Sequence, residues 1–222
     1  MSASRTQKKQ FSSYSLAQAM KQLGLSNLLP WPLKADRAPL SDFFQERLTR
    51  LERSFDLQSY EESKKLLIDA ICEEAILTTQ HLKIWKGVPL EGEQATGFVD
   101  YLIAERKRYL ENPCLCIIEA KKDDFEQGLA QCLVEMQACQ WQNQQTGWDI
   151  DIFGIVTNGT TWQFYKLVSL GSVYESSPYA TGDMGQLLGL LQQIFRACEA
   201  NLLSRKSLPK GATTSGIPTD CG

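Results

Sequence analysis

The stretch GFVDYLIA (97–104), with ERKRYLENP (105–113) and CLCIIEAKK (114–122) directly after it, decides the fold. The two outer pieces are apolar and as short as buried strands. The polar piece between them ends in Asn112-Pro113, which is a turn signal. The segment therefore predicts a β-hairpin with a long loop.

Three charged residues interrupt these apolar strands: Asp100 in the first, and Glu119 and Lys121 in the second. Because side chains alternate between the two faces of a strand, Glu119 and Lys121 share one face. Buried carboxylates are costly unless they are paired or bound to a cation. A lone Glu-x-Lys is usually a solvated strand edge or an ion pair. Two acids and a lysine at the end of an apolar hairpin, however, indicate a divalent-metal site.

Periodic patterns continue on both sides of the hairpin. Apolar residues at helical spacing predict helices over 15–25, 41–55, 59–82, 124–141 and 184–203. Short apolar or alternating runs predict strands over 85–93, 151–159 and 160–168, with a weaker one at 173–174. Ser59 and Glu62 predict a capping box at the start of the second long helix. This order predicts an α/β fold, with a mixed β-sheet flanked by helices.

The chain of 222 residues divides into three parts by composition. Residues 1–40 are expected to be a peripheral N-terminal extension, because three prolines separate them from the first long helix. Residues 41–204 hold the predicted domain. Residues 205–222 are rich in Lys, Gly, Ser, Thr and Pro, and we expect them to be disordered.

The charged residues of the hairpin and the following helix resemble a known signature. Asp100, then Glu119-Ala120-Lys121, then Gln131 on a helix, are similar to the motif of the PD-(D/E)XK nuclease superfamily. The stretch IFGIVTNGTTWQFYKL (152–167) resembles the strands that follow this motif in restriction-type nuclease domains. Val99 departs from the pattern, where a proline often precedes the aspartate. The resemblance spans about residues 58–167. It implies a restriction-endonuclease-like core of αβββαβ order and metal-dependent hydrolysis of DNA phosphodiester bonds that leaves a 5′-phosphate.

The resemblance also implies roles for individual residues. Mg²⁺, or Mn²⁺ in its place, would be held by Asp100, Glu119 and the Ala120 carbonyl, since Mg²⁺ prefers oxygen ligands and keeps several waters. Lys121 would lie near the attacking water or the scissile phosphate. Burial lowers the pKa of such a lysine and neighbouring acids raise it, so the sequence leaves the sign open. Gln131 would touch a nucleotide or a ligand water; otherwise it is polar helix surface.

Members of this superfamily often carry a further acid on the first helix. Glu62 resembles that position best, although it could serve as a capping residue alone. Glu73 is the alternative, because both acids lie on the polar side of the 59–82 helix. Helical periodicity does not choose between them.

Nucleic acid, most simply DNA, is the expected partner, and a homodimer is left open. With a net charge of −3, the chain must bind DNA through local basic residues. The candidates are Lys83, Lys86, Arg106, Lys107, Arg108 and Lys122. A membrane partner is not expected, because no apolar run approaches the ~20 residues of a membrane span.

Cysteine and histidine usage excludes several chemistries. The seven cysteines form no C-x-x-C pair, and we expect them to be small buried residues of a reducing, cytoplasmic protein. His81 is the sole histidine, which argues against a Ser-His-Asp hydrolase or a His-rich metal site. A catalytically silent nuclease-fold scaffold that binds nucleic acid or a protein is the alternative to the enzyme. A small-molecule α/β enzyme fits less well, because no Gly-rich phosphate loop is present.

Overall fold

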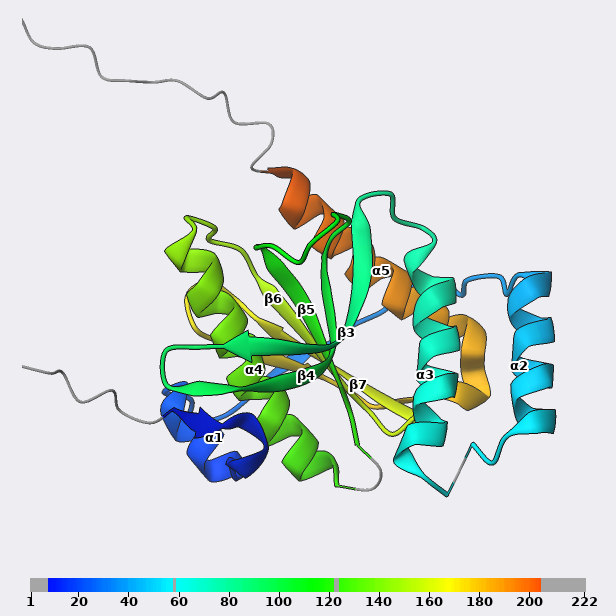
Figure 1. Cartoon of the computed structure of the whole chain (residues 1–222), viewed down its shortest axis with the longest axis horizontal. Coiled ribbons are helices and arrows are strands. Elements are labelled where there is room, and N and C mark those ends of the chain that lie inside the picture. The colour runs from blue at the N-terminus through cyan, green and yellow to red at the C-terminus, as the bar shows by residue number, and fades with distance from the viewer. Residues whose placement is uncertain (1–7, 58, 122–123, 205–222) are drawn as a thin grey trace, which may run out of the picture.

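The computed structural model of the chain describes residues 8–57, 59–121 and 124–204 (Figure 1). The helices are α1 (Leu16–Gln22), α2 (Asp42–Ser54), α3 (Glu61–Ile76), α4 (Phe125–Gln145) and α5 (Met184–Ser204), with short 3₁₀ helices η1 (Phe11–Ser13) and η2 (Thr181–Asp183). The strands are β1 (Lys9–Gln10), β2 (Leu29–Trp31), β3 (Leu82–Glu91), β4 (Ala95–Glu105), β5 (Cys114–Ala120), β6 (Ile152–Thr157), β7 (Thr161–Leu167), β8 (Val173–Ser176) and β9 (Tyr179–Ala180).

The strands form one mixed sheet of order β1-β4-β5-β6-β7-β8-β2, in which β3 also pairs with β4 and β9 with β7. The predicted hairpin is present, because β4 and β5 pair antiparallel across a long loop. Strands β5 and β6 are parallel and are joined through α4. The order α3-β3-β4-β5-α4-β6 matches the predicted αβββαβ order, and the predicted α/β class with a mixed sheet is confirmed.

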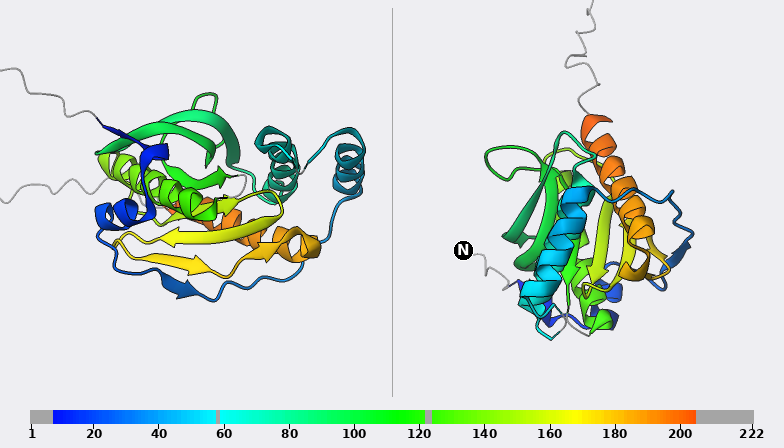
Figure 2. Two further views of the ribbon diagram at one scale, coloured as in Figure 1. Left: turned by 90° about the horizontal axis from the view of Figure 1, so that it is seen from below. Right: turned by 90° about the vertical axis from the view of Figure 1, so that its right-hand side faces the viewer.

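Helices cover both faces of the sheet (Figure 1, Figure 2). Helix α4 packs on β5 and β6, with α1 beside it, while α3 and α5 pack together on the other face and α2 lies outside α3. The sheet separates two hydrophobic clusters, and consecutive residues of β5 belong to different ones. Ile117 is in the cluster that contains Leu133 and Met136 of α4, and Ile118 is in the cluster that contains Phe195 of α5. Glu119 therefore falls on the α4 face, because it shares its side of the strand with Ile117.

Two predicted helix starts are confirmed by their N-caps, and one is wrong. Ser15 and Ser41 cap α1 and α2 through their hydroxyl oxygens, which accept backbone N–H groups of the first turn. Helix α3 begins at Glu61 with Tyr60 as its N-cap, and no side chain caps it, so the capping box of Ser59 and Glu62 is absent. The Ser59 N–H instead donates to Asp56 Oδ1 at 3.2 Å, within the preceding turn.

Helix α3 also ends earlier than predicted, at Ile76 instead of residue 82. The backbone N–H groups of Gln80 and His81 donate to Glu199 Oε1 of α5 at 2.7 and 2.6 Å. These tertiary bonds satisfy the backbone in an extended conformation, and β3 begins at Leu82.

The segment 8–40, expected to be peripheral, lies at both edges of the sheet and adds to its core. Strand β1 pairs with β4, and β2 pairs with β8. Phe11 is 1% exposed, and a Cβ at Gly97 would lie only 2.8 Å from its ring. Further buried side chains of this segment are Tyr14, Ala19, Leu33 and Ala38. The expected tail, 205–222, and residues 1–7 lie outside the described residues.

The cysteines behave as expected of small core residues. Cys72, Cys114, Cys116, Cys132, Cys139 and Cys198 are free and buried, and Cys221 lies outside the described residues. Within the described ranges, no helix is long and apolar enough to cross a membrane.

Candidate functional site

The two predicted carboxylates meet where the β4–β5 ladder ends. The register pairs Tyr101 with Ile118, so one further step sets Asp100 opposite Glu119. Asp100 Oδ2 accepts the backbone N–H of Ala120 at 3.0 Å. The Asp100 side chain thus replaces the next backbone hydrogen bond between β4 and β5, and it holds the ends of these two strands together.

Glu119 is fully buried on the α4 face of the sheet. Its Oε1 lies 2.8 Å from Lys121 Nζ, whereas its Oε2 has no hydrogen-bond partner among the described residues. Burial, and then the negative charge of Asp100, raise the pKa of the Glu119 carboxyl to about 7, against the opposing effect of Lys121. Glu119 and Lys121 share one face of the strand, as predicted, and there they form an ion pair.

Lys121 follows β5 and is fixed from two sides. Its backbone N–H donates to Thr157 O at 2.8 Å. Its aliphatic stem lies against Gly128 in the first turn of α4, where a Cβ would come within 3.0 Å of Lys121 Cγ. Burial lowers the pKa of the Lys121 ammonium, but the charges of Glu119 and Asp100 outweigh that effect and leave the pKa raised. The sequence left open whether the pKa of Lys121 is raised or lowered, and in the structure it is raised.

Gln131 lies in the core and not on the polar helix surface. Its side chain is 6% exposed, and Nε2 donates to Glu135 Oε1 at 2.9 Å. Glu135, one turn further along α4, is fully buried. Burial, and then the charge of Glu119, raise the pKa of the Glu135 carboxyl well above its ordinary range. Gln131 Oε1 and Glu135 Oε2 have no hydrogen-bond partner among the described residues.

Sequence reasoning missed Glu135. Helical periodicity sets it near Gln131 and off the apolar stripe of Leu129, Cys132, Leu133 and Met136, so the pattern gave no signal for its burial.

Lys65 of α3 was also missed. Its Nζ lies 3.1 Å from Asp100 Oδ1, 3.1 Å from Glu62 Oε1 and 3.5 Å from Glu61 Oε1. Burial lowers the pKa of this ammonium, but Asp100 and Glu62 outweigh the effect, so that the pKa is raised. The sequence carried no signal for this contact, because it joins the start of α3 to a strand that follows it by more than thirty residues.

The two candidate helix acids have different surroundings. Glu62 contacts Lys65 and through it neighbours Asp100, but its side chain is 85% exposed. Glu73 faces α2, where it pairs with Arg47. Of the two, only Glu62 lies at the end of α3 that reaches the site.

The basic residues proposed for DNA contact are partly neutralised within the protein. Lys86 binds Asp69 at 2.7 Å, and Lys107 lies between Glu105 and Glu111 at 3.0 and 2.7 Å. The remaining candidates make weaker contacts: Lys83 lies over the Trp85 ring, Arg106 Nε donates to Leu82 O, and Arg108 lies over the Tyr109 ring. Lys122 lies outside the described residues.

The donor set fits a hard divalent cation with few protein ligands. No group of three or more His, Cys, Asp or Glu residues placed to hold a metal occurs within the described ranges. Mg²⁺, however, is commonly held by one or two carboxylates, with water and phosphate completing its shell. The unpartnered Oε2 of buried Glu119 beside Asp100 is the kind of oxygen that such a cation would satisfy.

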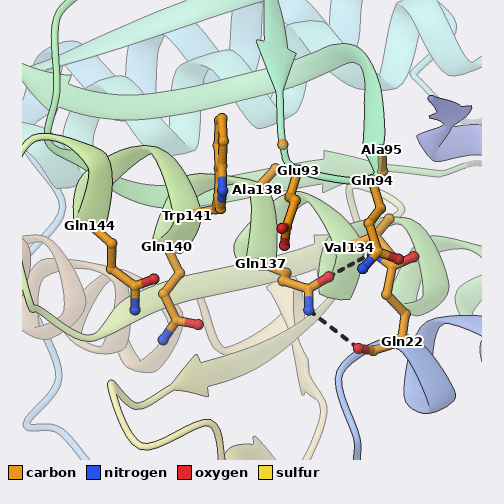
Figure 3. A pocket seen from close by; sticks show the side chains of 11 residues that line it. Gln22, Glu93, Gln94, Ala95, Val134, Gln137, Ala138, Gln140, Trp141 and Gln144 are labelled. Carbon is orange, nitrogen blue, oxygen red and sulfur yellow. Dashed lines mark hydrogen bonds between the residues drawn. The ribbon is translucent and has the colours of Figure 1, made fainter. Parts of the chain in front are cut away.

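A separate pocket lies on the outer side of α4 (Figure 3). It holds about 140 Å³ between α4, α1 and the β3–β4 turn, and none of the predicted site residues lines it. Gln22, Gln94, Gln137, Gln140 and Gln144 contribute amides to it, with the Trp141 ring on one side. Gln22 Nε2 donates to Gln137 Oε1 at 2.6 Å, so two of these amides already satisfy each other.

No protein-family model matches this chain, and no curated protein matches it either. The functional assignment therefore depends on the geometry of the site.

Proposed function

We propose that the chain is a Mg²⁺-dependent nuclease of the PD-(D/E)XK type, with a restriction-endonuclease-like core, that hydrolyses phosphodiester bonds of DNA. The observation that carries the proposal is the buried Glu119–Lys121 ion pair opposite Asp100 at the end of the β4–β5 hairpin. The αβββαβ order and the parallel β5–β6 pair support it, because they resemble the arrangement expected of that superfamily. Fold likeness alone does not establish a function, so the charged residues carry the greater weight.

Asp100, Glu119 and the Ala120 carbonyl would hold Mg²⁺, with Mn²⁺ able to replace it. Bound there, the cation would lower the pKa of a water nucleophile and neutralise charge on the phosphate. Asp100 is held in position by the Ala120 N–H, and Glu119 by its burial under α4. Both carboxylates are thereby oriented before any ligand arrives.

Lys121 acts as a cation. Because the pKa of its ammonium is raised, the group stays protonated at neutral pH. A fixed positive charge next to the scissile phosphate would stabilise the negative charge that develops there. A role as general base is disfavoured, because that role needs the neutral amine.

A catalytically silent scaffold is the second candidate, and one observation favours it. Both oxygens of Asp100 are engaged, Oδ1 by Lys65 and Oδ2 by Ala120 N–H. A cation at Asp100 would have to displace Lys65 or share Oδ1 with it. In the scaffold, the Lys65–Asp100 pair would be a permanent structural contact between α3 and β4.

The test is a Mg²⁺ or Mn²⁺ titration of the full chain against labelled single- and double-stranded DNA. Lys121→Ala and Asp100→Asn should each lower the cleavage rate by at least a hundredfold, whereas the surface controls Lys21→Ala and Glu46→Gln should cleave like wild type. Lys21 and Glu46 are exposed and far along the chain from the site. Wild-type protein that cuts no substrate at any metal concentration would replace the nuclease with the scaffold.

A further inference from the structure

Four buried oxygens between β5 and α4 have no hydrogen-bond partner among the described residues: both oxygens of Glu119, Gln131 Oε1 and Glu135 Oε2. Glu119 Oε1 forms the ion pair with Lys121 Nζ at 2.8 Å, which leaves Glu119 Oε2, Gln131 Oε1 and Glu135 Oε2. The residues that carry them are 0%, 6% and 0% exposed. A buried acceptor without a partner lowers the stability of the folded state, and the cost is larger when the group is charged. Three such acceptors in one place point to a ligand that satisfies them together.

The three residues belong to one cluster. Helix α4 packs directly on β5, and Gln131 and Glu135 are one helical turn apart on its buried side. Gln131 Nε2 binds Glu135 Oε1 at 2.9 Å, which leaves the amide oxygen and the second carboxylate oxygen free. Glu119 is close enough for its charge to raise the pKa of the Glu135 carboxyl.

The charges of the cluster do not cancel. Lys65 pairs with Asp100 and Lys121 pairs with Glu119, at 3.1 and 2.8 Å. Among the described residues, Glu135 takes part in no salt bridge, and its bond from Gln131 is to a neutral amide. Three acids thus face two lysines, and the uncompensated acid, Glu135, is fully buried.

We propose that Glu119, Gln131 and Glu135 form an inner cation site between β5 and α4, for a hard divalent cation such as Mg²⁺ or Mn²⁺. Two carboxylates and an amide oxygen are ligands that such cations take, and water completes the shell. Glu119 also belongs to the Mg²⁺ ligands proposed above, Asp100, Glu119 and the Ala120 carbonyl, which we call the outer site. The inner site does not depend on phosphodiester hydrolysis, because a silent scaffold could use the same cation to hold α4 against the sheet.

The experiment titrates Mn²⁺ alone into EDTA-treated full-length protein by calorimetry and follows the melting temperature in parallel. Glu135→Gln keeps the size of the side chain and an oxygen that can accept the Gln131 N–H. Without metal this variant should melt higher than wild type, because a buried repulsion with Glu119 is removed. The affinity of its tightest Mn²⁺ site should be at least tenfold lower than in wild type. The rise in melting temperature that Mn²⁺ causes in wild type should be absent from the variant.

A variant that melts higher than wild type without metal, but binds Mn²⁺ more weakly, has lost a metal ligand and has not misfolded. A damaged fold would lower the melting temperature instead. Gln131→Met provides a second variant, which removes the amide oxygen and should weaken Mn²⁺ binding at the same site. Glu46→Gln on α2 is the matched acid control and should bind Mn²⁺ like wild type. Asp100→Asn should bind Mn²⁺ at the inner site as wild type does, because Asp100 is a ligand of the outer site alone. Equal Mn²⁺ binding by Glu135→Gln and wild type, or no binding by wild type at millimolar Mn²⁺, would overturn the inner site.

Failure of the two proposals can be told apart. Binding of Mn²⁺ that depends on Glu135, without any DNA cleavage, keeps the inner site and removes the nuclease. Metal-dependent cleavage with Mn²⁺ binding that is unchanged in Glu135→Gln keeps the nuclease and removes the inner site.

Discussion

Replacing Glu119 by glutamine should stabilise the metal-free protein at alkaline pH and leave it almost unchanged at acid pH. The carboxyl is fully buried, and its pKa is raised from 4.5 to about 7 by burial and by the charge of Asp100. Between these two pH values the folded state binds the proton more tightly than the unfolded chain does. The contribution to stability is therefore fully present below pH 4.5 and is lost as the pH rises through about 7.

The size of the effect follows from the two pKa values. At about 1.4 kcal/mol per pH unit, the difference corresponds to on the order of 3 kcal/mol of stability lost by pH 8. Glutamine has no proton to lose and nearly the same shape, so it escapes this loss. The pKa of about 7 already includes the opposing attraction of Lys121, so we expect the net gain at pH 8 to be this same amount, about 3 kcal/mol.

The assay is urea unfolding of both proteins in EDTA, followed by tryptophan fluorescence at intervals from pH 4 to pH 8.5. The difference in unfolding free energy between variant and wild type should be near zero at pH 4 and should grow through neutral pH. Taking this difference cancels the titration of shared groups that do not interact with Glu119, whereas Glu135 and Lys121 titrate differently in the variant. A difference that is constant with pH, or that favours wild type at pH 8, would refute the argument that burial dominates at Glu119.

Two further predictions concern the fold that carries the site. Gly154→Ala should lower the unfolding free energy by about 1–3 kcal/mol in urea unfolding, because a Cβ there would overlap Met136 Sδ under α4; an unchanged midpoint would contradict this packing. Ser41→Ala should cost about 1–2 kcal/mol in the same assay, because the hydroxyl caps α2 and also binds Glu74 Oε2 at 3.0 Å; Ser41→Thr, which keeps the hydroxyl, should restore most of the loss.

Local patterns were sufficient to predict most of the elements. The apolar runs of the hairpin, the helical periodicity of the long helices and the alternation of the later strands all act over a few residues. Such signals work because side-chain periodicity is set by neighbours in the chain. Prediction failed where a distant residue competed for the backbone, as Glu199 does at the end of α3.

The residues of the candidate site also fall into two groups, those that local sequence patterns indicated and those that only the structure revealed. Asp100, Glu119 and Lys121 were found because charges within apolar strands stand out, and the pairing of the last two follows from strand alternation. Lys65 could not be found, because nothing local to α3 indicates that its ammonium reaches Asp100. The sign of the Lys121 pKa shift also needed the structure, since burial and neighbouring acids act in opposite directions.

By itself, then, the sequence determined the α/β class, the order of the elements from α2 to α5 apart from β9, and the positions of the charges in the apolar strands, whereas it did not predict β1 or β2. Those properties follow from short-range periodicity and from the cost of burying a charge. Only the tertiary structure decided which charges meet. It brought Gln131 and Glu135 of α4 beneath Glu119, and it turned Glu73 toward Arg47 instead. Contacts between separate elements depend on how helices pack on the sheet, and that packing is set by the whole core and not by any one stretch of chain.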